Sequence, residues 1–418
     1  MHRTTSLCSK AFKSFSSKIQ IHTNLGIQQH VRLFHSNHFQ RMTSTTIEPQ
    51  VLFHDRSSEP SVQVITLNRP KALNSLNLEM VRELTPRYEQ LSSSNDPCKM
   101  IILKGTGDKA FCAGGDIKAI YESKDPKFFA EEYQLNYLIG SLYEKHKKVQ
   151  IALLNGITMG GGVGLSVQPD TIRVATEKTV FAMPETAIGF FCDVGGSYFL
   201  PRIPIKGLGM YLALTGARLK GEQCVVAGIA THFVPSDKLG ELEELLVKLS
   251  REHNGLLSPQ IIGSEITKHF PQDQYLNTSH AKSFLQHEKE ISLFDPSVNP
   301  TVHDIIESLK KLNTHHAEHT LKTLEQMSPT SLRVVHRQLR MGAVLGYKEC
   351  FDMELGIAKH MMFGHDFFEG VRALLVDKDK NPKWNPPTLD QVKKKEIDAY
   401  FEAFLTTSAK ITQHNENA

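Results

Sequence analysis

The sequence predicts an α/β protein in which a core of short buried strands is followed by a mainly helical part. Short aliphatic or β-branched runs alternate with stretches of helical spacing through the first half of the chain. After about residue 238 the glycines and strand signals become sparse, and charged amphipathic stretches replace them. These observations predict one α/β core and a helical region that follows it.

The elements can be assigned in chain order. Residues 62–67 read as a strand, because they are rich in β-branched side chains and are bounded by turn residues. Residues 78–91 read as a helix, since their apolar positions recur every three or four residues. Further buried strands are expected at 100–103, 151–154, 172–175 and 180–182. Residues 242–246 and 305–309 have the pattern of amphipathic helices.

The charge distribution indicates a targeting segment. Formal net charge over the 418 residues is only +3, so nucleic-acid binding is not expected. No acidic residue precedes Glu48, whereas six basic residues do. Residues 1–41 therefore resemble a mitochondrial transit peptide, with a disordered basic tail as the alternative. None of the six cysteines forms a C-x-x-C pair, which favours a reducing compartment such as the mitochondrial matrix.

Residues 149–169 are uncharged and long enough to span a membrane. The run contains Gln150, Asn155, Gln168 and several glycines, which would make a poor lipid-facing helix. We interpret it as a buried strand, a glycine turn and a helix, and we predict no membrane segment.

Two segments place small residues between a strand and a helix. Residues 110–117 contain Gly114 and Gly115, and residues 155–164 contain the triplet Gly160–Gly162. Small side chains allow a ligand to approach the backbone, and the N–H groups at a helix start are free to bind an anionic oxygen. Two such turns could form an oxyanion hole for a thioester. Each alone could equally be a tight structural turn.

A third segment, residues 181–196, holds two acids in an apolar, glycine-marked setting. These are Glu185 and Asp193. Burial raises the pKa of a carboxyl group and so favours acid–base chemistry near neutral pH. The alternative is structural, with Glu185 and Asp193 capping short helices.

Four separated motifs occur in the order and spacing of the crotonase (enoyl-CoA hydratase/isomerase) superfamily. They are residues 67–74, 112–117, the triplet Gly160–Gly162 and Pro184-Glu185. Residues 50–235 thus resemble that superfamily, and the chain is similar to its CoA-thioester hydrolases at 131–133, 156–164, 182–189, 193–196, 366–379 and 382–384. The resemblance implies a crotonase-like spiral of ββα units. The expected division is a leader at 1–41, a catalytic core at 50–238, a helical region at 239–400 and a tail at 401–418.

The resemblance also implies roles for individual residues. Gly115 and Gly161 match the positions whose N–H groups hold the thioester oxygen. Glu185 matches the main catalytic carboxylate, acting as a base for water or as a nucleophile. Asp193 matches the second acid, and Glu132 matches a substrate-contacting acid. Residues 68–74 and 115–118 fall where this fold holds CoA.

The expected reaction is hydrolysis of 3-hydroxyisobutyryl-CoA, or of other short 3-hydroxyacyl-CoA esters, in valine breakdown. The resemblance implies an acyl-CoA partner, no cofactor beyond the CoA of the substrate, and a chain that could form a homo-oligomer. Hydratases carry a glutamate where Gly164 stands, which argues against hydration. The alternatives are a non-catalytic subunit of the mitochondrial ribosome and an enoyl-CoA isomerase.

One further motif resembles a metal site. Residues 315–319 satisfy the zinc-protease pattern H-x-x-E-H. They lie in a polar stretch, so a solvated helix face is the better interpretation, and we predict no metal.

Overall fold

A computed structural model of the chain describes residues 48–54, 57–253 and 257–416, with side chains described up to residue 407. The predicted transit peptide at 1–41 lies outside these residues. From Glu48 onward the chain forms one compact unit. The predicted boundaries at residues 50, 238 and 400 remain predictions.

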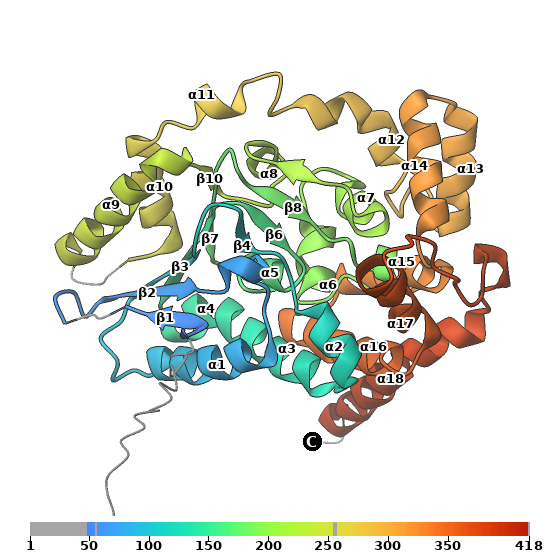
Figure 1. Cartoon of the computed structure of the whole chain (residues 1–418), viewed down its shortest axis with the longest axis horizontal. Helices are drawn as coiled ribbons and strands as arrows, with labels where there is room; N and C mark the ends of the chain where they lie inside the picture. Colours follow the sequence, from blue (N-terminus) through green and yellow to red (C-terminus); the bar gives the residue numbers. More distant parts are fainter. Residues whose placement is uncertain (1–47, 55–56, 254–256, 417–418) are drawn as a thin grey trace, which may run out of the picture. The chain divides into compact units, whose positions relative to one another are not determined.

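The larger sheet has six strands in the order β1-β2-β3-β5-β7-β10, and Figure 1 labels all of them except β5. All neighbouring pairs are parallel except β1 with β2. Every residue of β5 is buried, as expected for a central strand covered on both faces. The strands are β1 (Val51–Phe53), β2 (Val62–Leu67), β3 (Met100–Gly105), β5 (Val149–Leu154), β7 (Ile172–Ala175) and β10 (His232–Phe233).

A second sheet has four short strands in the order β4-β6-β8-β9, and its first three strands are parallel. Each of these three directly follows a strand of the larger sheet, and each leads into a short helix. This repetition is the predicted spiral of ββα units. The strands are β4 (Ala110–Cys112), β6 (Ile157–Met159), β8 (Val180–Ala182) and β9 (Leu219–Lys220).

The helix predicted at 78–91 from its periodicity is confirmed. Helix α1 (Leu78–Ser92) begins where Asn77 accepts a hydrogen bond from the Met80 N–H, and its buried residues include Val81, Leu84 and Tyr88. The other helices here are α2 (Ile117–Ser123), α3 (Lys127–Gly140), α4 (Leu142–His146), α5 (Gly161–Gly164), α6 (Gly196–Phe199), α7 (Leu208–Thr215) and α8 (Gln223–Val226).

The chain after residue 238 is helical, as predicted. Helices α9 and α10 supply leucines and isoleucines to a cluster that covers one face of the larger sheet. The later helices pack on the main core, where α16 contacts both α3 and α18 (Figure 1). The α-helices of this region are α9 (Leu239–Glu252), α10 (Pro259–His269), α11 (Asp273–Leu276), α12 (Glu288–Ser292), α13 (Val302–Leu312), α14 (His315–Gln326), α15 (Pro329–Gly342), α16 (Tyr347–Met361), α17 (His365–Val371) and α18 (Lys394–Glu416).

The uncharged run at 149–169 folds as β5, β6 and α5. The predicted strand and helix are present, but a second strand, β6, which was not predicted, lies between them. No helix in the described part of the chain is both long enough and apolar enough to cross a membrane.

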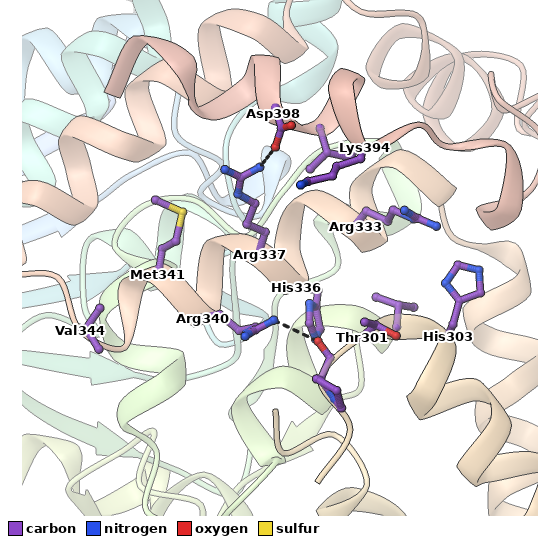
Figure 2. Close-up of a pocket in the computed structure, with 13 residues that line it drawn as sticks. Thr301, His303, Arg333, His336, Arg337, Arg340, Met341, Val344, Lys394 and Asp398 are labelled. Atoms are coloured by element: carbon purple, nitrogen blue, oxygen red, sulfur yellow. Dashed lines mark hydrogen bonds and ion pairs between the residues drawn. The ribbon is translucent and has the colours of Figure 1, made fainter. Parts of the chain in front are cut away.

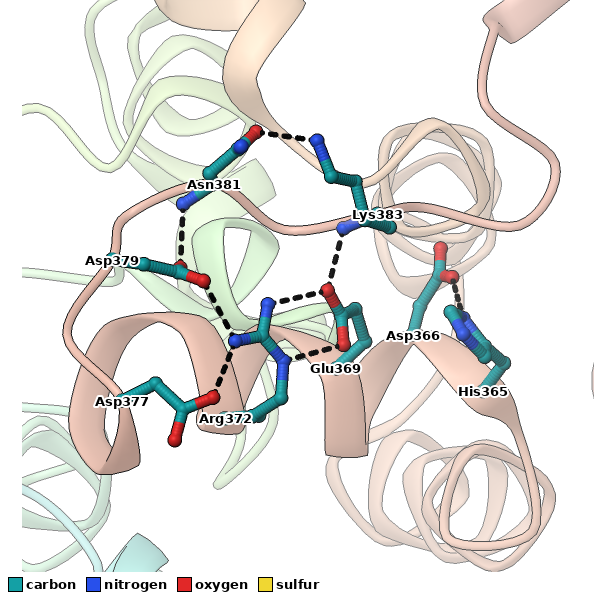
Figure 3. A network of polar contacts seen from close by, with 8 residues as sticks. All are labelled: His365, Asp366, Glu369, Arg372, Asp377, Asp379, Asn381 and Lys383. Carbon is teal, nitrogen blue, oxygen red and sulfur yellow. Dashed lines mark hydrogen bonds and ion pairs between the residues drawn. The ribbon is translucent and has the colours of Figure 1, made fainter.

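A polar network centred on Arg372 fastens the segment after α17 (Figure 3). The Arg372 guanidinium donates two hydrogen bonds to Glu369, at 2.8 and 2.9 Å, and also contacts Asp377 and Asp379. The backbone N–H of Lys383 donates to Glu369 as well. These bonds lower the pKa of Glu369 to about 2. The network holds residues 377–383 against α17.

Candidate active site

The two glycine turns predicted to form an oxyanion hole lie side by side. Gly115 follows β4, and Gly161 follows β6, the parallel neighbour of β4. Parallel neighbours end at the same edge of a sheet, which brings the turns together. A Cβ atom added to Gly161 would lie 3.2 Å from the Gly115 nitrogen. The sequence prediction that these residues face one another is therefore consistent with the geometry.

The N–H groups of both glycines are available to a ligand. Gly161 is the first residue of α5, so its N–H has no acceptor within the helix. Over residues 48–54, 57–253 and 257–416, no protein acceptor is found for the N–H of Gly115 or of Gly161. Gly161 is buried. Two free donors at one edge of a sheet suit an oxygen that gains negative charge.

Glu185 and Glu132 approach this pair from two different elements. Glu185 begins η2 (Glu185–Ile188), directly after β8 at the same edge of the small sheet. A Cβ atom on Gly160 would lie 3.1 Å from Glu185 Oε1. Glu132 lies on α3, and its Oε1 would be 2.5 Å from a Cβ atom on Gly161. Both carboxyl groups thus border the glycine turns.

Asp193 completes the set from the loop between η2 and α6. Its Oδ2 accepts a hydrogen bond of 2.7 Å from the Tyr133 hydroxyl, and Tyr133 is the residue next to Glu132 on α3. The three acids are closed off from solvent, with exposed fractions of 2% for Glu132, 6% for Glu185 and 5% for Asp193. The structure thus brings together all five residues singled out in the sequence.

Burial changes the protonation of all three acids. It raises the pKa of Glu185 and of Glu132 well above the ordinary value, and the charge of Asp193 raises both further. Burial also raises the pKa of Asp193 to about 7, although the bond from Tyr133 opposes this shift. Like charges at close range cannot all ionise, so the cluster holds protons near neutral pH. Such a group can accept or donate a proton during a reaction.

Two oxygens in this cluster have no partner in the folded chain. Glu132 Oε1 and Glu185 Oε2 are buried and, among the described residues, accept no hydrogen bond. The amide of Asn136, one turn after Glu132 on α3, is also buried and unpaired. Unpaired polar atoms are costly in a protein interior, so their concentration here indicates a site awaiting a polar ligand.

A fourth buried acid holds the Asp193 loop in place. Glu354, on α16, is fully buried and accepts hydrogen bonds of 2.9 Å from the N–H groups of Gly195 and Ser197. Burial raises its pKa to about 8. From α15, the Gln338 amide donates to the Cys192 carbonyl oxygen at 2.6 Å. The C-terminal helices therefore position the loop that carries Asp193.

Sequence reasoning missed these supporting residues. Glu354 could have been noticed, because it lies at the centre of a helical face otherwise made of Cys350, Ile357 and Met361. Gln338 gives no comparable signal, since a polar residue among apolar ones is common at a helix surface.

Helix α17 covers the turn that carries Glu185. A side chain at Gly189 would collide with the backbone of Asp366, and one at Gly370 would collide with the backbone of Ile188. The two segments therefore meet backbone to backbone. The aromatic rings of Phe367, on α17, and Phe190 also pack together here, with their centroids 5.2 Å apart.

The segments expected to hold CoA lie beside the glycine turns. Arg69 donates to Asp116 at 3.0 Å, which joins the two segments. Asn74 is fully buried and donates to the carbonyl oxygens of Thr106 and Ala110, so its role is structural. A cavity of about 310 Å³ opens next to them, lined by residues 70–71, 73–74 and 106–110.

Comparison with known proteins identifies the class. Residues 62–401 match the family described as enoyl-CoA hydratase/isomerase, and the chain belongs to that family. Two solved structures overlay on 84% of the chain with a TM-score of 0.71: a carnitinyl-CoA dehydratase from Mycobacterium thermoresistibile, 33% identical over 96% of its length, and an enoyl-CoA hydratase from Rhodobacter sphaeroides 2.4.1, 30% identical over 97%.

Curated relatives narrow this class to the 3-hydroxyisobutyryl-CoA hydrolases. The mitochondrial 3-hydroxyisobutyryl-CoA hydrolase of Dictyostelium discoideum is 45% identical, covering 87% of this chain and 93% of the relative. The protein of the same name from Homo sapiens is 45% identical, covering 83% and 88%, and that from Danio rerio is 47% identical, covering 81% and 87%.

Proposed function

We propose that the chain hydrolyses the thioester of 3-hydroxyisobutyryl-CoA to the free acid and CoA in the mitochondrion, as a step of valine breakdown. The observation that carries the proposal is the meeting of the Gly115 and Gly161 turns with three buried carboxyl groups. This meeting supports the proposal, because a thioester carbonyl bound at the two turns would lie close to the carboxyl groups that border them.

In this proposal the carbonyl oxygen of the thioester accepts hydrogen bonds from Gly115 and Gly161. Negative charge develops on that oxygen as the carbonyl carbon is attacked, so donors placed there lower the barrier. Glu185 either takes a proton from the attacking water or attacks the carbonyl itself to give an acyl anhydride, which water then hydrolyses. CoA leaves as the thiol in both cases.

Asp193 and Glu132 select the acyl group in this scheme. A 3-hydroxyl group can donate to an ionised carboxylate, and Asp193, with a pKa of about 7, is ionised for part of the time at neutral pH. The unpaired Oε1 of Glu132 offers a second contact to substrate. Residues 68–74 and 115–118 hold the CoA portion in this proposal, and no further cofactor or metal is required.

Local packing supports hydrolysis over hydration. A Cβ atom on Gly164 would lie 2.6 Å from Val194 Cβ and 2.8 Å from Asn136 Oδ1. The position therefore has no space for the glutamate that hydratases carry there. The remaining acids suit attack on a carbonyl.

The test is thiol release from a panel of purified acyl-CoA esters. We expect turnover of 3-hydroxyisobutyryl-CoA by the parent and a loss of at least 10²-fold in Glu185→Gln. Glu131→Gln is the matched control, because Glu131 is the neighbour of Glu132 but pairs with Arg82 at the surface. Equal rates for the parent and Glu185→Gln would refute the role of Glu185.

Two other outcomes would replace the proposal. Activity on enoyl-CoA esters alone would indicate an isomerase or hydratase. Absence of any turnover, with co-sedimentation on ribosomes, would indicate the ribosomal subunit. We also propose that the chain forms a homo-oligomer, because the side chain of Phe363 is 85% exposed and suits a contact between two copies. Light scattering would measure the mass of the assembly directly.

A further inference from the structure

A basic cavity lies away from the candidate active site, on the other side of α15. Its volume is about 820 Å³, and it is bounded by α15, the start of α13 and the start of α18 (Figure 2). Gln338 and Gly342 of α15 face the Asp193 loop, where Gln338 bonds to Cys192 and Gly342 packs on Ser197. Arg333, Arg337 and Arg340 follow at intervals of four and three residues, so they share the opposite face.

The cavity carries an excess of positive charge. Its lining includes Arg333, Arg337, Arg340 and Lys394 but only one acid, Asp398, which leaves three net positive charges. Asp398 pairs with Arg337 at 2.5 Å.

Part of this charge is uncompensated. Arg340 donates to the Pro300 carbonyl oxygen at 3.1 Å, a neutral acceptor that leaves the charge of Arg340 uncompensated. In the part of the chain that the structure describes, no protein partner is found for the charged groups of Arg333 or Lys394. An anionic ligand would neutralise the positive charges of Arg333, Arg340 and Lys394.

A buried histidine points to a ligand independently of the charges. His336 lines the same cavity, is only 7% exposed, and among the described residues its Nε2 has no hydrogen-bond partner. Burial and the neighbouring Arg340 lower its pKa to about 4, so the ring is neutral at physiological pH. A buried ring nitrogen without a partner is destabilising, and an oxygen of a bound ligand would satisfy it.

The lining indicates the chemical class of this ligand. Arg333 and Arg340 lie seven residues apart on α15, about 10 Å along the helix, a separation that matches two or more phosphate groups better than a single ion. Met341, Val344 and Ile397 add an apolar portion that could contact a base. The volume lies within the range of small-molecule sites.

We propose that this cavity binds a soluble nucleotide carrying at least two phosphate groups. The phosphates contact Arg333, Arg340 and Lys394, and His336 bonds to one phosphate oxygen. The proposal does not depend on the reaction proposed above, because the cavity shares no residue with the glycine turns or the acids.

Calorimetric titration of the full chain with ADP tests this. We expect saturable binding by the parent and at least tenfold weaker binding by the double variant Arg333→Gln/Lys394→Gln. Lys395→Gln is the matched control, because Lys395 neighbours Lys394 on α18 and does not line the cavity. This control should keep the parental affinity.

His336→Leu separates a ligand site from a merely basic surface. We expect weaker ADP binding without any fall in the unfolding temperature of the ligand-free protein, since an unpaired buried nitrogen is removed. Loss of both stability and binding would assign His336 to the core and overturn its role here.

Three other outcomes would overturn the proposal. The first is no ADP binding at millimolar concentration. The second is equal binding by the parent and the double variant, with ADP raising the KM of hydrolysis, which would place the nucleotide in the CoA site. The third is binding only to vesicles of anionic phospholipid and not to ADP, which would assign the cavity to lipid headgroups.

Discussion

Glu354→Gln tests how the Asp193 loop is held, because the buried Glu354 carboxyl group accepts hydrogen bonds from that loop. Between about pH 5.5 and 7 this carboxyl group is protonated in the folded protein and ionised in the unfolded chain. Its pKa rises from an ordinary value of 4.5 to about 8 on folding. A raised pKa in the folded state means that the stability contribution is complete below pH 4.5 and is lost as pH rises towards 8. Between about pH 5.5 and 7, this one group lowers the free energy of unfolding by about 1.4 kcal/mol per pH unit.

Glu354→Gln keeps the shape of the side chain and removes the titrating group. The glutamine NH₂ cannot accept a hydrogen bond, so the N–H of Gly195 or of Ser197 loses its acceptor. That loss costs about 1–3 kcal/mol at pH 5.5. The dependence of unfolding free energy on pH should then become shallower by about 1.4 kcal/mol per unit, while the other buried acids keep their contribution.

Urea denaturation at several pH values between 5.5 and 7, followed by circular dichroism, measures both effects. Asp352→Asn is the control, because Asp352 lies on the same helix but faces solvent and pairs with Lys348. Parallel curves for the parent and Glu354→Gln would show that folding does not raise the pKa of Glu354, and the reasoning would be refuted.

Three further predictions concern the turns and their supports. Gly161→Ala should reduce hydrolysis by about 10²-fold, since the added Cβ would press on the Gly115 turn. The control is Gly240→Ala, where an added Cβ has no atom within 4 Å and should increase the free energy of unfolding by about 0.5–1 kcal/mol. Unchanged turnover in Gly161→Ala would contradict the proposed site. Tyr133→Phe removes a hydrogen bond that lowers the pKa of Asp193, so the part of the pH profile of kcat/KM that depends on Asp193 should move to higher pH. An unchanged profile would show that Asp193 takes no part in the reaction. Arg372→Gln should lower the unfolding temperature, more at low salt than at high salt, and a salt-independent change would argue against the ionic network.

The sequence was sufficient for four of the six strands of the larger sheet, for α1, and for parts of α9 and α13. Strands β1 and β10 were not predicted, because they have only three and two residues. Residues 62–67 and 78–91 carry clear periodicity, and the structure has β2 and α1 there. The second sheet was not foreseen as a sheet, because β4 and β6 have three residues each and β9 has two, too few for a periodic pattern.

The glycine turns, Glu185 and Asp193 were predicted because they lie in motifs of unusual composition, whereas Glu132 was predicted only from the family resemblance. Glycine-rich turns and isolated acids among apolar residues are visible one segment at a time. The residues that position them cannot be recognised in this way, because Glu354 and Gln338 contact a loop more than 140 residues away in the chain. Contacts of that kind depend on tertiary packing, which no local pattern encodes.

The backbone contact between α17 and the Glu185 turn has a consequence for shortened forms of the chain. A protein ending near residue 360 would keep Gly115, Glu132, Gly161, Glu185 and Asp193. It would nevertheless lack the helix that rests on Ile188 and Gly189, so water would reach the carboxyl groups and their pKa values would fall towards ordinary ones. A premature stop codon just before α17, near residue 360, should therefore abolish turnover while sparing all five residues of the candidate site.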